Sequence, residues 1–189
     1  MTAEATVPDA SPRQRIALGV AYDGRAYNGW QSQADGNTVQ DQLERSLQAF
    51  TAGDRPSTLC AGRTDSGVHG LMQVVHFDTE TPRDTVSWMR GTNRYLPRDI
   101  SVQWARVVPP SFHARASAIT RRYAYILYAG GVRPTIDCGR VGWIHRPVDT
   151  HAMQAALADV KATYTLKWAP YNVFARCYID AAKRIGRSP

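Results

Sequence analysis

The chain has 189 residues, enough for one large domain or for one domain and part of another. Its apolar content of 43% is typical of a soluble globular protein, and no apolar run is long enough to cross a membrane. Its three cysteines are widely spaced, so neither a disulfide framework nor a zinc site is indicated. Residues 1–14 lack the apolar core of a signal peptide, and we expect a disordered leader on a cytoplasmic protein.

The net charge of +7 is unevenly distributed along the chain. Residues 1–160 hold 17 arginines, no lysine and 15 acidic residues, which is a net charge of +2. The last 29 residues carry the remaining +5. The basicity of the whole chain is therefore not an argument for RNA binding.

Six segments in the first 110 residues alternate between strand and helix patterns. Residues 16–22 alternate large apolar with small residues, which is typical of a strand, whereas Val39, Leu43 and Leu47 recur at helical spacing after the N-cap candidate Thr38. The expected elements are a strand at 16–22, a helix from Val39 that ends at Gly53, strands at 57–60 and 72–77, a helix from residue 84 or 85 to about 95, and a strand at 100–105. On the second helix, Val86, Met89 and Leu96 are expected to face the core.

This order of strand, helix, strand, strand, helix, strand is the split βαβ, ferredoxin-like arrangement. It predicts an α+β fold with an antiparallel, RRM-like sheet over residues 15–110. Many RNA-binding modules and many unrelated enzymes share this fold, so the fold alone selects no function.

The segment between the two middle strands, residues 61–70, is rich in residues that carry chemistry. Arg63 and Asp65 are two residues apart and face the same side if the segment is extended. A cation so close would favour the ionised carboxylate, and an ionised, oriented aspartate is a nucleophile or a general base. The alternative interpretation is a polar hairpin loop with a local ion pair.

Aromatic residues outside that segment are candidates for contact with a nucleic-acid base. Trp30 lies in a stretch of aromatic and amide residues that could line a base-binding surface, or it fills the edge of the sheet. Residues 121–128 predict a strand that carries Tyr123, and this strand is either a stacking surface or an ordinary core strand. Nearby arginines suited to phosphate contacts are Arg115, Arg121 and Arg122.

Eight short motifs occur in order between residues 15 and 158. They are Tyr22-Asp-Gly24, Gly29-Trp-Gln31, Thr38-Val-Gln40, the run from Ala61 to His69, Gln73-Val-Val-His-Phe77, Leu96-Pro97, Phe112-His-Ala-Arg115 and Arg121-Arg-Tyr123. In this order and spacing the chain resembles the N-terminal portion of the tRNA pseudouridine synthase A family.

The resemblance implies the pseudouridine synthase fold and a homodimeric isomerase that converts uridine to pseudouridine in tRNA, without a metal or cofactor. It implies that the modified uridines lie on the 3′ side of the anticodon stem-loop, at tRNA positions 38 to 40. Asp65 would be the catalytic aspartate, Tyr123 would stack on the displaced uracil, and Arg63 would hold the flipped geometry. Whether Asp65 attacks the sugar or the base, or removes a sugar proton, is left open.

The resemblance stops near residue 160, whereas the family continues with a second, similar half. We therefore expect residues 111–160 to begin an incomplete second domain, and residues 161–189, where lysine first occurs, to be an unrelated tail on a truncated synthase. A catalytically inactive RNA-binding fragment is the alternative function. A metal-dependent hydrolase that uses His69, His76 and His113 is a third hypothesis, although their spacing is not a ligand pattern.

Overall fold

The computed structural model describes residues 13–53 and 55–158, which fall into two compact units. The described part of the first unit ends at Arg121, and the second unit begins at Arg122. No helix in these ranges is long and apolar enough to span a membrane. The predicted tail lies outside the described residues, and so does the predicted leader except for its last two residues, of which Gln14 already begins a strand.

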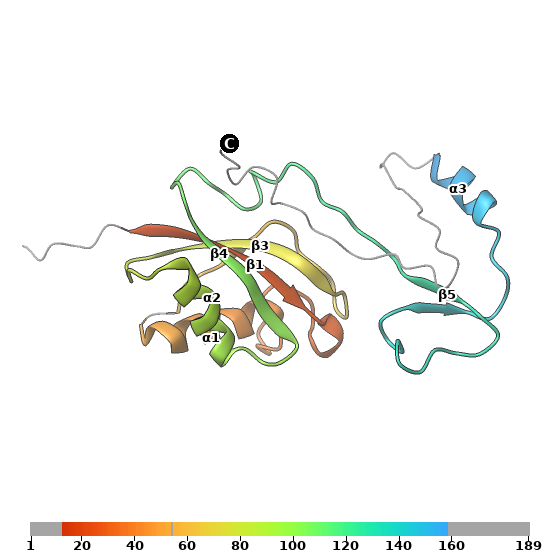
Figure 1. Ribbon diagram of the computed structural model, residues 1–189, viewed down its shortest axis with the longest axis horizontal. Helices are drawn as coiled ribbons and strands as arrows, with labels where there is room; N and C mark the ends of the chain where they lie inside the picture. Colours follow the sequence, from red (N-terminus) through yellow and green to blue (C-terminus); the bar gives the residue numbers. More distant parts are fainter. Residues whose placement is uncertain (1–12, 54, 159–189) are drawn as a thin grey trace, which may run out of the picture. The chain divides into compact units, whose positions relative to one another are not determined.

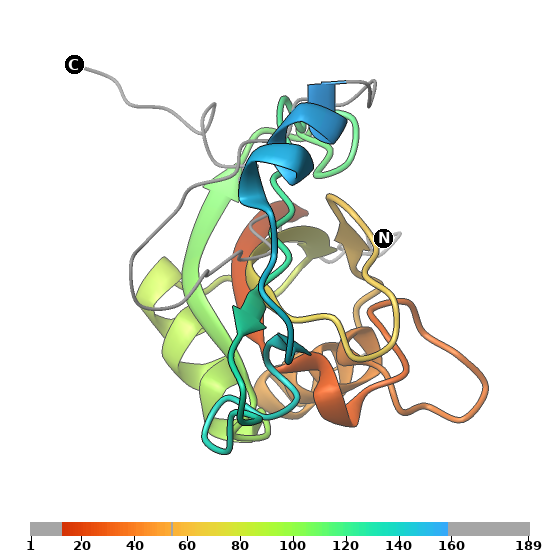
Figure 2. The same ribbon diagram turned by 90° about the vertical axis from the view of Figure 1, so that its right-hand side faces the viewer.

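The first unit is a four-stranded antiparallel sheet with two helices on one side (Figure 1). The strand order is β2-β3-β1-β4, which is the order of the ferredoxin-like fold, so the predicted α+β class is confirmed. Figure 2 shows the same four strands from the end of the sheet. The elements are β1 (Gln14–Tyr22), the short 3-10 helix η1 (Gly24–Ala26), α1 (Val39–Thr51), β2 (Leu59–Cys60), β3 (Gly70–Thr79), α2 (Thr85–Tyr95) and β4 (Ile100–Val108).

The alternation of residue size along β1 separates the two faces of the sheet. Ile16, Leu18 and Val20 are fully buried in the core beneath the helices. On the opposite face Gly19 lies beneath the indole of Trp104, and a Cβ at this glycine would come within 2.2 Å of that ring. The small residues of β1 therefore let a large side chain cross the strand on this face.

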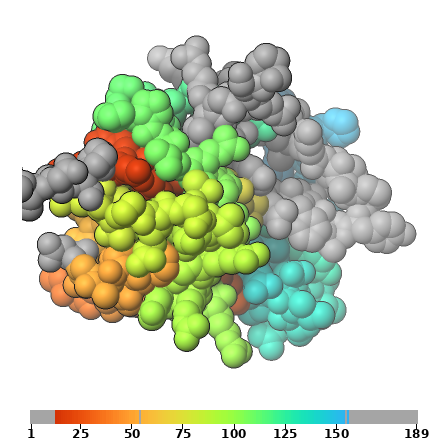
Figure 3. Space-filling view, turned by 60° about the vertical axis from the view of Figure 1, so that its left-hand side comes forward, coloured from red at the N-terminus to blue at the C-terminus, as the bar shows by residue number. Residues whose placement is uncertain are grey.

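The two helices begin at side-chain caps and bury one stripe each. The Thr38 hydroxyl accepts the Asp41 N–H at the start of α1, and the predicted stripe of Val39, Leu43 and Leu47 is buried. Helix α2 begins after the Asp84 cap and lies at the surface in Figure 3, where residues near position 90 are yellow-green. Its fully buried residues are Trp88 and Thr92, whereas Val86, expected on the inner stripe, is 49% exposed.

The face of the sheet away from the helices is partly covered by the segment that follows β4. Ala114 from this segment packs with Ala61 and Val74, and its N–H donates to Nδ1 of His76 over 3.2 Å. These contacts explain why the first unit continues to Arg121, beyond the predicted boundary at residue 110.

The second unit contains short elements. Strands β5 (Leu127–Ala129) and β6 (Gly142–Ile144) pair in parallel, and helix α3 (Thr150–Ala158) follows. The strand predicted at 121–128 therefore forms only from Leu127, where its partner β6 begins to pair.

Candidate active site

The segment from Ala61 to His69, called the 61–69 segment below, leaves β2 and returns as β3. The Ala61 N–H donates to the Val74 carbonyl over 2.8 Å, and the Gln73 side chain bonds to the backbone of Gly62. Thr64 is buried between the exposed residues Arg63 and Asp65. Buried and exposed side chains thus alternate here, as expected for an extended chain.

Hydrogen bonds from the core side hold the middle of this segment. The Tyr22 hydroxyl lies 2.8 Å from the Thr64 hydroxyl, and the Trp30 N–H donates to the Thr64 carbonyl over 2.9 Å. The Tyr27 carbonyl accepts the Ser66 hydroxyl and the Gly67 N–H, over 3.2 and 3.3 Å. The segment has no regular secondary structure, and yet its backbone is fixed from within.

Two glycines of the sequence motifs allow this close approach. A Cβ at Gly24 would lie 2.0 Å from the Val68 carbonyl oxygen. Gly29 has φ of +90°, and a Cβ there would lie 2.7 Å from the Thr64 carbonyl oxygen. Because both neighbours are backbone atoms of the 61–69 segment, any larger residue would displace that segment.

The end of the segment contacts a charged cluster after β1. The Asp23 carboxylate lies 2.7 Å from the Arg25 guanidinium and 3.1 Å from Nδ1 of His69. The hydrogen bond from Arg25 lowers the pKa of Asp23 to about 2. Asp23 is therefore ionised at neutral pH and links η1 to the last residue of the segment.

The outer side of the segment is open. Neither the Arg63 nor the Asp65 side chain has a hydrogen bond or an ion pair with any residue that the structure describes, so the local ion pair of the alternative interpretation is not formed. Exposed charges gain little from pairing in water, which explains why proximity in sequence did not produce contact. The Asp65 carboxylate is consequently available to a ligand.

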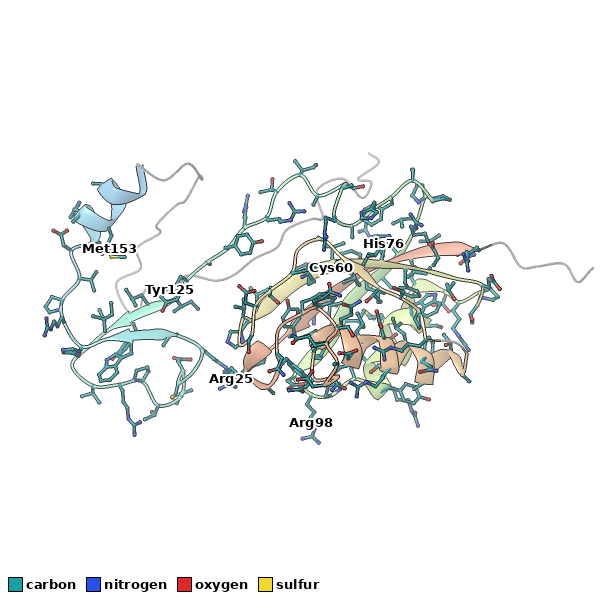
Figure 4. All side chains as sticks on the ribbon, turned by 180° about the vertical axis from the view of Figure 1, so that it is seen from behind. Arg25, Cys60, His76, Arg98, Tyr125 and Met153 are labelled. Carbon is teal, nitrogen blue, oxygen red and sulfur yellow. The ribbon has the colours of Figure 1, made fainter. Side chains whose placement is uncertain are left out.

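The structure brings two further arginines to the start of the segment. Nε of Arg121 donates to the Ala61 carbonyl over 2.9 Å, and its Nη2 donates to the Arg115 carbonyl over 3.1 Å. Beside them Cys60 is buried, and burial raises the pKa of its thiol against an opposing hydrogen bond from the Arg115 side chain. Cys60, labelled in Figure 4, belongs to the core cluster that also contains Val75 and Phe77. Arg121 therefore ties the segment after β4 to the 61–69 segment.

Trp30 is not part of an exposed surface. Its side chain is 1% exposed, and its ring centroid lies 5.7 Å from that of Tyr22 within the core. The prediction that Trp30 stacks on a base is wrong, because a buried ring offers no face to a ligand; Trp30 packs in the core against Tyr22 instead. Its contribution to the site is the backbone hydrogen bond to Thr64.

Arg122 and Tyr123 belong to the second unit. Both are exposed, Tyr123 to 54%, and Tyr125 further along is 73% exposed (Figure 4). The predicted roles of Arg122 in phosphate binding and of Tyr123 in stacking on uracil stay predictions.

The histidines do not form a metal centre in the described ranges. The rings of His76 and His113 lie 5.0 Å apart, whereas His69 contacts Asp23. Burial lowers the pKa of His76, whose Nδ1 already accepts the Ala114 N–H. Among the residues described, no three His, Cys, Asp or Glu side chains are grouped closely enough to hold a metal ion.

The exposed residues of the 61–69 segment were predicted from the sequence, but the residues that hold its backbone in place were not. Tyr22, Asp23 and Gln73 stood in the motifs without an assigned function. Gln73 is fully buried in the middle of an apolar strand, and a polar residue at such a position is the signal that could have indicated a structural hydrogen bond.

Comparison with known proteins identifies the family. A family model described as "tRNA pseudouridine synthase" matches residues 19–115, a range that includes the whole 61–69 segment and the residues that brace it from β1, β3 and the loop before α1. The chain belongs to the tRNA pseudouridine synthase family.

Individual relatives give the same family. The protein named "tRNA pseudouridine synthase A" from Polaromonas sp. strain JS666 is 63% identical over 146 residues, which cover 77% of this chain and 55% of the relative. The protein of the same name from Albidiferax ferrireducens is 64% identical, with 77% and 56% covered, and that from Acidovorax ebreus is 61% identical, with 76% and 52% covered. The chain thus spans about half the length of the curated relatives it matches.

Proposed function

We propose that the protein acts in the isomerisation of uridine to pseudouridine in tRNA, with Asp65 as the reactive carboxylate. The observation that carries this proposal is the position of Asp65, which is exposed and unpaired among the described residues on a segment held rigidly from within. Membership of the family and the names of the relatives support the reaction.

The chemistry suits a carboxylate that works without a redox partner. The isomerisation breaks the bond between N1 of uracil and C1′ of the ribose and forms a bond between C5 and C1′. C5 loses its hydrogen as a proton and N1 gains one, so the uridine is neither oxidised nor reduced. An ionised aspartate supplies either a nucleophile or a base for these steps.

A uridine within a stem must leave its stack before Asp65 reaches it. Arg63 and Arg115 are exposed and suited to phosphate contacts, and Tyr123 offers a ring for stacking on the displaced base. In line with the family resemblance, we place the modified uridines on the 3′ side of the anticodon stem-loop and the protein in the cytoplasm as a homodimer.

Release of tritium from C5 of uracil tests the proposal, because C5 loses its hydrogen only when the new carbon–carbon bond forms. The 189-residue chain is incubated with a tRNA transcript that carries 5-tritiated uridine, beside the Asp65→Asn variant. We expect release by the wild-type chain and a loss of about 10³-fold or more with asparagine, which matches aspartate in size but is neither a base nor a nucleophile. Unchanged release by the variant would exclude Asp65.

A second candidate function is RNA binding without turnover. It is favoured by the lack of a described cation within ion-pair distance of Asp65. Under this alternative the folded chain binds tRNA, releases no tritium, and has the same tRNA affinity with Asp65 or Asn at this position.

A further inference from the structure

Helix α2 and its two flanks carry four exposed arginines. Within the helix, Arg90 and Arg94 are one turn apart and lie on the side opposite the buried Trp88 and Thr92. The yellow-green surface in Figure 3 is this outer side of the helix. The arginine face, as we call it below, consists of Arg83, Arg90, Arg94 and Arg98.

No acidic side chain neutralises the arginine face. None of its four members forms an ion pair with a residue that the structure describes; Arg83 lies over the ring of Phe50 instead. The single acidic residue between positions 83 and 98 is Asp84, whose carboxylate caps the helix by accepting from Ser87. The face therefore carries an excess of three positive charges, more than the net charge of residues 1–160.

On the neighbouring helix α1, the acidic side chains are buried and paired. Its acidic residues Asp41 and Glu44 are 3% and 7% exposed, and both pair with Arg55. The helical layer thus buries its negative charges and exposes positive ones. Like charges one turn apart destabilise a helix, and a face that only needs solvation gains from mixed signs. A polyanion is the ligand that complements such a surface.

We infer that the arginine face binds the ribose-phosphate backbone of an RNA. Arginine presents several donors in a planar fork that matches phosphate oxygens, and it keeps its charge at every physiological pH. Contacts of this kind bind any sequence and position an RNA rather than read it. The inference rests on the proposed function, because it supplies the same tRNA with a second contact surface.

The arginine face leads to the end of the sheet that carries the 61–69 segment. Arg98 precedes Asp99, whose carbonyl accepts the Asp23 N–H over 2.8 Å, and Asp23 in turn contacts His69. Figure 4 shows Arg98 pointing away from the sheet, on the side of the unit opposite His76. The guanidinium of Arg25 is paired with the Asp23 carboxylate over 2.7 Å, so this junction adds no net positive charge. Contacts through Asp99 and Asp23 thus connect the C-terminal end of the arginine face to the last residue of the 61–69 segment.

The test measures the affinity of the 189-residue chain for a tRNA transcript by fluorescence anisotropy over a range of salt concentrations. The variant Arg90→Gln/Arg94→Gln removes two charges and keeps two long side chains on the helix surface. We expect weaker binding and a slope of log K against log salt that is smaller by about 1.5, since each phosphate contact contributes about 0.7 to 0.9. The matched control, Arg90→Lys/Arg94→Lys, keeps the charges and should keep the slope.

Each other outcome overturns a stated part of the account. A glutamine variant that is folded by circular dichroism and binds tRNA with the wild-type slope overturns the inference. The inference is also overturned if the glutamine variant loses affinity for polyglutamate but not for tRNA, because this result would indicate an acidic protein partner. If the wild-type chain binds no tRNA, the proposed function fails as well. If the slope falls as expected but the wild-type chain releases no tritium, the proposed function fails and the arginine face stands.

Discussion

The candidate residues lie on two segments without regular secondary structure, and the two segments are held in different ways. In the 61–69 segment, Thr64 is buried and bonded to Tyr22 and Trp30, while Asp65 beside it is exposed. In residues 123–126 of the second unit, Tyr123 and Tyr125 are 54% and 73% exposed. In the first segment, a buried side chain thus holds the backbone in place while the side chain next to it stays exposed.

This difference separates residues that hold the fold from residues that meet a ligand. In residues 63–65 the two kinds alternate, so a substitution there should affect either folding or function according to the side on which it lies. In residues 123–126 both tyrosines are mostly exposed, so a substitution of either should change the free energy of unfolding little. Substitutions at Gly29, Tyr22, Asp23 and Tyr123 test this distinction.

Gly29→Ala should have the largest effect on folding. The new Cβ would meet the Thr64 carbonyl, and alanine is strained at φ of +90°, so we expect a loss of about 3 kcal/mol in the free energy of unfolding, measured in urea. Gly67→Ala is the control, since Gly67 also has positive φ of +77° but no atom within 4 Å of its Cβ position. Its expected cost is about 1 kcal/mol. Equal losses in the two variants would mean that close packing against Thr64 is unimportant.

Tyr22→Phe should lower the free energy of unfolding by about 1.5 kcal/mol, because it leaves the buried Thr64 hydroxyl without its partner. Thr64→Val removes the other partner. A double-mutant cycle on the free energies of unfolding should give a coupling of about 1 kcal/mol between the two residues. Strictly additive losses would show that this hydrogen bond does not hold the segment.

Asp23→Asn should lower the free energy of unfolding by about 1 kcal/mol at pH 7. The value is small because the ion pair with Arg25 is partly exposed to water. The pKa of Asp23 is about 2 in the folded protein and 3.8 in its ordinary state, so its contribution is complete above about pH 4 and is lost as the pH falls toward 2. Unfolding measured from pH 2 to 7 should show the wild type and variant converging below about pH 4. A constant difference would contradict the role of the Asp23 charge.

Tyr123→Ala should have the smallest effect on folding, below about 0.5 kcal/mol, because the side chain is mostly exposed. Its affinity for tRNA should fall by about 1 to 2 kcal/mol if the ring stacks on a base. Urea unfolding and fluorescence anisotropy on the same preparation would separate the two quantities. A variant with lower stability and unchanged affinity would make Tyr123 a structural residue.

The sequence predicted the elements of the first unit because their signals are local. The Thr38 cap and the stripe of Val39, Leu43 and Leu47 lie within one helix, and each was found in its predicted place. Helix α2 was harder, since Trp88 rather than Val86 faces the core. Trp88 packs edge-on against Phe50 and Phe77, which are distant in sequence, and these partners decide which face of α2 is buried.

The sequence indicated which residue types form the candidate site, but it did not indicate the contacts that these residues make. Arg63 and Asp65 were identified from their spacing, whereas the ion pair of the alternative interpretation is not formed. Trp30 was assigned to a base-binding surface because composition does not tell on which side of a chain an aromatic ring lies. The need for glycine at positions 24 and 29 depends on backbone about 35 to 45 residues away, which no local pattern reports.

The most direct test of the division between the two sides of the 61–69 segment compares Asp65→Ala with Thr64→Ala in urea unfolding. We expect an unchanged free energy of unfolding for Asp65→Ala, within about 0.5 kcal/mol, and a loss of about 1 to 2 kcal/mol for Thr64→Ala. A loss of more than about 1 kcal/mol with Asp65→Ala, or none with Thr64→Ala, would contradict it.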